Sequence, residues 1–233
     1  MRSIVLAALS AALLVNTAQA ATVAVSADRL VDPASGKTAE KPLVIITDGR
    51  VVSVGRQGDT VPAGATQVSL PGVTLLPGLI DTHVHLTSSP LYGGYTGYQF
   101  SDAFWTAIGA RHASDTLEAG FTTVRNVGSA FYGDVGLREA IDGGFIPGPR
   151  IVTAAYSFGA TGGHCDETYF PPSMAQKAPY NADSQDEARH SVRALRKYGA
   201  QVIKICATGG GLLARLGARR PADDVGGNEG RGR

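Results

Sequence analysis

The chain has 233 residues, a formal net charge of +1 and 18% charged residues. A protein of this composition has no strong electrostatic field, so we expect no nucleic-acid partner. Its two cysteines, Cys165 and Cys206, are too few for a disulfide framework, and the sequence leaves open whether they pair.

Residues 1–20 have the pattern of a signal peptide. Arg2 supplies a positive start, Ile4 to Val15 form a short apolar run, and Ala18-Gln19-Ala20 gives the small-x-small pattern that precedes cleavage. The apolar run is too short for a permanent membrane span. We therefore expect an exported protein, periplasmic or secreted, without a permanent membrane anchor.

Residues 21–73 form a small β unit by their pattern. Val23 to Val25 and Leu43 to Ile46 are apolar runs of strand length, and Asp48-Gly49 is a hairpin turn signal leading into Val51 to Val54. Nothing in this segment carries obvious chemistry.

Residues 74–211 alternate between strand and helix patterns. An apolar run enters Asp81 to Leu86, which reads as a buried strand that ends in polar groups. The expected elements that follow are a helix at 102–119, a strand at 121–127, a short helix at 137–141, a strand at 150–155, a helix at 184–198 and a strand at 201–206. Ser184 is the expected N-cap of the last helix and Gly199 its stop. This order predicts parallel β/α units with a site at the carboxyl ends of the strands.

Residues 212–233 break this pattern. They contain five arginines, no lysine and no aromatic residue, and they supply no further strand. Because a closed barrel of eight β/α units needs about 250 residues, four units make only part of one. We interpret 212–233 as an aberrant tail, disordered or produced by a frameshift or truncation.

His83 and His85 form a pair at the end of the first strand of this series. Side chains two residues apart on a strand share a face, so both imidazoles point the same way. Two neutral imidazoles side by side suit an ion such as Zn²⁺, and we predict that both are metal ligands.

Three motifs in residues 74–211 resemble those of one known family. Residues 76–85, Leu-Pro-Gly-Leu-Ile-Asp-Thr-His-Val-His, resemble the first-strand motif of the amidohydrolase superfamily. Residues 120–126 resemble the second-strand motif of the branch with Xaa-Pro dipeptidases and imidazolonepropionase-like proteins, which usually has aspartate where this chain has Asn126. Residues 203–210, Ile-Lys-Ile-Cys-Ala-Thr-Gly-Gly, form the third motif. The resemblance implies an α/β fold: a small β-sandwich unit at 21–73, then the N-terminal portion of a (β/α)8 TIM-type barrel at 74–211, truncated after strand 4.

The resemblance also implies roles for particular residues. Lys204 would be carboxylated and would join His83 and His85 in holding one or two Zn²⁺ or similar divalent ions. His164 and Arg125 would bind substrate. The alternatives are a lysine that reaches solvent, a solvent-facing loop histidine and an arginine in a structural ion pair. His112 and His190 lie in helical segments, and we interpret both as surface or packing residues.

Part of the family's apparatus is missing from the sequence. Such enzymes use two more histidines and a late aspartate as general base, but no histidine follows His190, and Asp223 and Asp224 lie in the tail. We expect a metal-dependent amidohydrolase that hydrolyses C–N bonds of dipeptides, Xaa-Pro or related, in a truncated and inactive form. An imidazolonepropionase-like cyclic amide hydrolase or deaminase, and a non-catalytic remnant, are the alternatives. The expected partner is a small molecule or dipeptide, and a homo-oligomer is left open.

Overall fold

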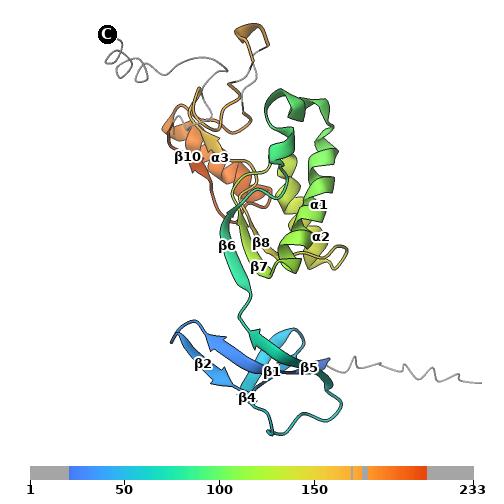
Figure 1. The fold of residues 1–233 in the computed structure, drawn as a ribbon. Helices are drawn as coiled ribbons and strands as arrows, with labels where there is room; N and C mark the ends of the chain where they lie inside the picture. The colour runs from blue at the N-terminus through green and yellow to red at the C-terminus, as the bar shows by residue number, and fades with distance from the viewer. Residues whose placement is uncertain (1–20, 169, 175–177, 209–233) are drawn as a thin grey trace, which may run out of the picture. The chain divides into compact units, whose positions relative to one another are not determined.

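The structure, a computed structural model, describes residues 21–168, 170–174 and 178–208 (Figure 1). Its chain divides between Pro77 and Gly78 into two compact units, a few residues after the expected boundary at 73/74. The predicted signal peptide, 1–20, and the predicted tail, 212–233, lie outside the described residues. Within the described part of the chain, no helix is both long and apolar enough to cross a membrane.

The first unit is built on one five-stranded sheet. Its strands are β1 (Thr22–Asp32), β2 (Lys37–Glu40), β3 (Pro42–Thr47), β4 (Arg50–Arg56) and β5 (Thr66–Leu75). They follow the order β2-β1-β3-β4, and β5 pairs in parallel with β1. Because β5 continues to Leu75, the unit extends past residue 73.

The core of this first unit is small. Ala24, Leu43 and Ile45 are buried together, while Val51 and Val52 on β4 are exposed. A sandwich needs a second sheet facing the first. The described residues of this unit supply one sheet, so the sandwich remains a prediction.

The second unit contains the β/α units. Its main elements are β6 (Leu79–Val84), α1 (Asp102–Glu118), β7 (Phe121–Asn126), α2 (Gly133–Asp142), β8 (Arg150–Thr153), β9 (Phe158–Gly159), α3 (Gln185–Lys197) and β10 (Ile205–Cys206). Short 3-10 helices lie at Pro90–Tyr92, Gly94–Gln99, Ala130–Tyr132 and Pro172–Met174. The strands β6, β7 and β8 form a parallel sheet in that order, as the alternation of patterns predicted.

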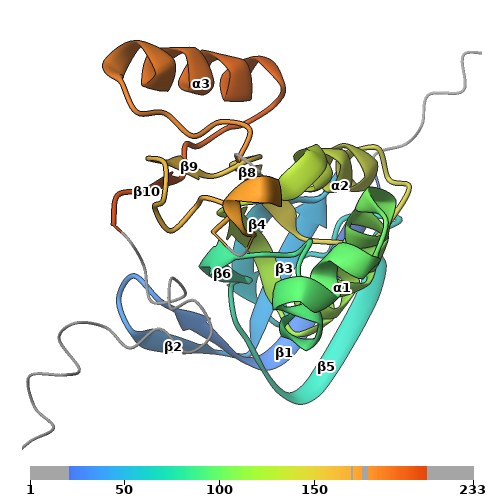
Figure 2. The ribbon, with the colours of Figure 1, turned by 90° about the horizontal axis from the view of Figure 1, so that it is seen from above.

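Helices α1 and α2 lie side by side and pack on one face of this sheet (Figures 1 and 2). Val124 of β7 and Ile151 of β8 are buried there with Ala113 of α1 and Leu137 of α2. Leu86, just after β6, joins the same cluster. These two helices leave the opposite face of the sheet uncovered, and we call it the uncovered face.

The expectation of a buried first strand is wrong for β6. Its residues are exposed or half-buried along its whole length, and Leu79 and Ile80 are among the exposed apolar side chains. The reason is its position, because β6 is the edge strand of its sheet and pairs only with β7.

The expected strand at 201–206 is also wrong in extent, since only Ile205 and Cys206 form a strand, and they pair with β9. The backbone N–H groups of Gln201 and Val202 both donate to the Thr153 carbonyl, at 2.7 and 3.1 Å. The side chain of Gln201 then accepts from the Thr153 N–H at 3.2 Å. The Gln201 side chain thus accepts the hydrogen bond that a backbone carbonyl would accept in a regular strand pair, and residues 201–204 do not form a ladder with β8.

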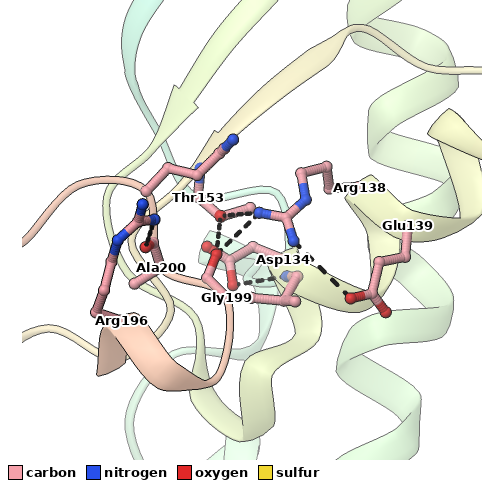
Figure 3. Close-up of polar contacts among 9 residues, drawn as sticks. Asp134, Arg138, Glu139, Thr153, Arg196, Gly199 and Ala200 are labelled. Atoms are coloured by element: carbon pink, nitrogen blue, oxygen red, sulfur yellow. Dashed lines mark hydrogen bonds and ion pairs between the residues drawn. The ribbon is translucent and has the colours of Figure 1, made fainter. Parts of the chain in front are cut away.

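Hydrogen bonds of Arg138 and Thr153 connect α2 to the segment that follows α3 (Figure 3). The Arg138 guanidinium donates to the Thr153 hydroxyl and to the Gly199 carbonyl, both at 2.8 Å. The Thr153 hydroxyl also donates to the Gly199 carbonyl at 2.9 Å. Gly199 has a φ of +107°, which glycine adopts without strain, and it ends α3 as predicted.

The predicted N-cap of α3 is confirmed. The Ser184 hydroxyl accepts from the Glu187 N–H, and the Glu187 carboxylate accepts from the Asp183 N–H at 2.8 Å. Leu195 of this helix is fully buried against Val135 and neighbouring apolar residues. The helix that Ser184 caps is therefore packed into the core of the second unit near its carboxyl end.

Replacing Ser184 by alanine should lower the free energy of unfolding of the second unit by about 1 kcal/mol, because a capping acceptor is lost. Urea unfolding followed by fluorescence of Trp105, the single tryptophan, measures this. The exposed Ser173→Ala serves as control. Equal midpoints for the two variants would contradict the capping role.

Candidate active site

His83 and His85 lie on the face of the sheet that α1 and α2 leave uncovered. They alternate with Val84 and Leu86, whose side chains pack into the core beneath the helices. The two imidazole rings have their centroids 5.5 Å apart. The Asp81 carboxylate accepts from the His83 N–H at 2.9 Å, which orders the backbone where the strand ends.

The ring of His85 has a defined hydrogen bond. Its Nδ1 lies 3.2 Å from the Gly128 carbonyl oxygen, and a carbonyl can only accept, so Nδ1 carries the proton. Nε2 of the neutral ring then carries a free lone pair. This is the arrangement that metal-ligating histidines use, with one nitrogen donating to a carbonyl and the other facing the ion.

Three other predicted site residues lie near enough to His85 to act on its ring electrostatically. Partial burial of its ring lowers the pKa of His85, the Gly128 hydrogen bond opposes this, and the nearby His83, Lys204 and His164 lower it further. A lowered pKa keeps an imidazole neutral, which metal binding requires. The sequence separates these residues by up to 121 positions; the fold makes them electrostatic neighbours.

Lys204 and His164 are placed by the short sheet of β9 and β10. The Lys204 carbonyl accepts from the Phe158 N–H at 3.1 Å, and the His164 N–H donates to the Thr208 carbonyl at 3.2 Å. Cys165 and Cys206 form a disulfide with their Cα atoms 5.8 Å apart. The pairing that the sequence left open thus ties the His164 loop to the strand that follows Lys204.

Arg125 lies on β7 and is exposed. Its Nε donates to the Thr82 carbonyl at 2.7 Å, beside an irregularity in the pairing of β6 with β7. This contact uses one donor of the guanidinium to hold the end of β6. Its role in substrate binding stays a prediction.

The donor set partly fits a divalent ion. Among the described residues, no group of three or more His, Cys, Asp or Glu side chains could hold a metal. His83 and His85 offer two nitrogen donors of the kind that Zn²⁺ takes. The addition of oxygen donors by a carboxylated Lys204 stays a prediction.

Sequence reasoning missed a buried polar pair behind the histidines. Asn126 and Asp134 are both fully buried, and the Asn126 amide donates to the Asp134 carboxylate at 3.2 Å. Burial raises the pKa of Asp134, against the lowering effect of the N–H groups that donate to it. The one available signal was Asn126 itself, which departs from the aspartate usual in the second-strand motif.

Comparisons with known proteins identify the family of the chain. The sequence profile of the Amidohydrolase family matches residues 74–222, and so continues into the segment predicted to be an aberrant tail. Ochratoxinase from Aspergillus niger is 30% identical over an alignment of 201 residues that covers 78% of this chain and 41% of that protein. A dihydroorotase from Pelotomaculum thermopropionicum is 37% identical over 95 residues, 41% of this chain and 19% of that one.

Solved structures show the same relationship. A Xaa-Pro dipeptidase with methionine bound in its active site superposes with a TM-score of 0.71 at 28% identity, covering 79% of this chain and 47% of that chain. The ochratoxinase of A. niger gives a TM-score of 0.68 at 28% identity, covering 82% and 48%. The chain thus spans less than half the length of these relatives, in agreement with the expected correspondence to about half of such a protein.

The disulfide should contribute measurably to stability. Closing a loop between positions 41 residues apart contributes about 4 kcal/mol in the chain-entropy model, an upper value for a real protein. We expect the double variant Cys165→Ser/Cys206→Ser to unfold at lower urea concentration than the oxidised parent. The parent treated with a reductant is the matched control and should behave like the variant. Equal midpoints for oxidised and reduced parent would contradict the bond.

Proposed function

Because the chain belongs to the amidohydrolase family, we propose that the protein carrying it hydrolyses a C–N bond in a dipeptide of the Xaa-Pro type or a related compound. The observation that supports this most directly is the grouping of His83, His164 and Lys204 around His85. Similarity to a Xaa-Pro dipeptidase over 79% of the chain favours the dipeptide class.

In this proposal His83, His85 and Lys204 hold one or two Zn²⁺-like ions. When bound, such an ion polarises the scissile carbonyl and makes a water molecule acidic enough to attack it. The uncharged Lys204 amine would react with CO₂ and lose a proton, giving a carbamate. This change turns a cation into an anionic ligand and removes the cost of an ammonium group beside the ions.

His164 and Arg125 are proposed to bind substrate. The His164 loop is held by the disulfide at Cys165, so its imidazole would meet the scissile carbonyl or a carboxylate from a fixed position. The contact of Arg125 with Thr82 occupies Nε, and the terminal nitrogens would take the substrate carboxylate.

A second candidate is a hydrolase of cyclic amides or a related deaminase. The 37% identity to a dihydroorotase over 95 residues favours the cyclic class. A deaminase would more often use a single ion and would need no carboxylated lysine, so the position of Lys204 near His85 argues for the hydrolases. For the 233-residue chain by itself we propose little or no turnover, as in a non-catalytic remnant.

We also propose that the protein is exported. The support is the signal-peptide pattern of residues 1–20 together with the Cys165–Cys206 disulfide. Disulfides of this kind persist in oxidising compartments and are rare in the cytosol.

Replacing His83 and His85 together by alanine should abolish Zn²⁺ binding by the 233-residue chain, because both nitrogen donors are lost. Equilibrium dialysis of the metal-free chain against Zn²⁺ measures this. His190→Ala, on α3, is the matched control and should bind like the parent. Retention of the full metal content by the double variant would exclude the ligand assignment.

Carboxylation of Lys204 predicts a carbamate signal after incubation with Zn²⁺ and ¹³C-labelled bicarbonate, observed by ¹³C NMR. We expect Lys204→Ala to lose that signal and to bind Zn²⁺ more weakly, since a charged ligand is missing. Lys197→Ala, a lysine on α3, should keep both properties. A carbamate signal that persists in Lys204→Ala would show that another amine is modified.

A further inference from the structure

The side chain of Asn126 connects three parts of the second unit behind the candidate metal ligands. Its Oδ1 accepts from the Leu86 N–H at 2.8 Å, directly after His85. Its Nδ2 donates to the Gly128 carbonyl at 3.1 Å and to the Asp134 carboxylate at 3.2 Å. One fully buried amide therefore holds the residue after His85 and also the carbonyl that His85 contacts.

Asp134 fixes the orientation of that amide. Besides Asn126, its carboxylate accepts from three backbone N–H groups, those of Val135, Ala154 and Ala155, at 2.9, 3.1 and 3.0 Å. A carboxylate can only accept, so the atom of residue 126 that faces it must be the amide nitrogen. The amide oxygen is then directed at Leu86. The two ends of the Asn126 side chain cannot be exchanged without leaving buried groups unpaired.

The loop at Gly128 is shaped to receive the His85 ring. Gly128 has a φ of +145°, and a Cβ there would lie 3.4 Å from Cε1 of His85, so the backbone approaches the ring closely. The Gly128 carbonyl accepts both from His85 Nδ1 and from Asn126 Nδ2. The direction of that carbonyl, and with it the hydrogen bond to His85, depends on Asn126.

We infer that Asn126 is a positioning residue for His85: through the Gly128 carbonyl it holds the imidazole as the Nδ1–H tautomer, with Nε2 free to bind a metal. The tautomer can be measured without metal, whereas the use of Nε2 rests on the proposed function. Partners that orient a ligating histidine typically change metal affinity by about 10–100-fold when removed. Aspartate at this position would lack the donor to Gly128 and would place a second carboxylate against Asp134.

The test is the tautomer of His85 in the metal-free 233-residue chain with ¹⁵N-labelled histidine. Two-bond ¹H–¹⁵N correlation spectra at about pH 8, where histidine is ordinarily neutral, distinguish the tautomers. The spectrum of His85→Gln identifies the His85 signals. We expect Nδ1–H in the parent. In Asn126→Ala, the ratio of Nδ1–H to Nε2–H should fall by about fivefold or more, the factor for one lost hydrogen bond.

The matched control is Thr153→Val. Thr153 is also fully buried, and its hydroxyl bonds to Arg138 and Gly199 (Figure 3). The Asn126 side chain bonds to other groups, those of Leu86, Gly128 and Asp134. This variant should destabilise the second unit and leave the His85 tautomer unchanged. Asn126→Asp is a second test variant of nearly the same size, in case the alanine variant does not fold. It should lose the tautomer preference as well.

Titration with Co²⁺, followed by its visible absorption, separates this inference from the proposed function. We expect Asn126→Ala to bind Co²⁺ at least about 10-fold more weakly than Thr153→Val. A parent chain with the Asn126-dependent tautomer but no Co²⁺ binding would retain the positioning role and overturn the metal assignment. Co²⁺ binding together with a His85 tautomer that is Nε2–H, or that is the same in a folded Asn126 variant, would overturn the inference and leave the proposed function standing.

Discussion

The second unit depends on the packing of α1 and α2 against one face of the β6-β7-β8 sheet. Val124 and Ile151 are buried there at 0% and 2% exposure, which removes their apolar surface from water. Because side chains alternate across a strand, burial of one set fixes the direction of the other. His83 and His85 consequently share the uncovered face, and the chemistry of the molecule follows from where its core lies.

Polar groups at the carboxyl ends of these strands are held by the same packing. Asn126 is on the buried side of β7, one residue beyond Arg125 on the uncovered side. A buried amide or carboxylate is costly unless its hydrogen bonds are made, so this part of the core has little freedom to rearrange. The core therefore supports the backbone around His85 through directional bonds as well as through apolar contact.

The short sheet of β9 and β10 positions the remaining residues of the candidate site, and a disulfide helps to hold them there. It contributes few backbone hydrogen bonds, and the Cys165–Cys206 disulfide joins its loop to its second strand. Lys204 and His164 are held near His85 in this way. The strand predicted at 201–206 is mostly irregular because Gln201 bonds to Thr153 through its side chain, a choice that strand propensity does not encode.

Several features were determined by the sequence alone: the order of the three helices and of strands β6, β7 and β8 in the second unit, the cap of α3 at Ser184, and the motifs that place the chain in its family. These depend on local periodicity, on neighbouring residues or on a contiguous motif. Only the tertiary structure decided that Cys165 meets Cys206 and that Asn126 bonds to Gly128 and Asp134. Each of these depends on which distant segments pack together, and the free energy of such long-range contacts is not carried by any local pattern of residues.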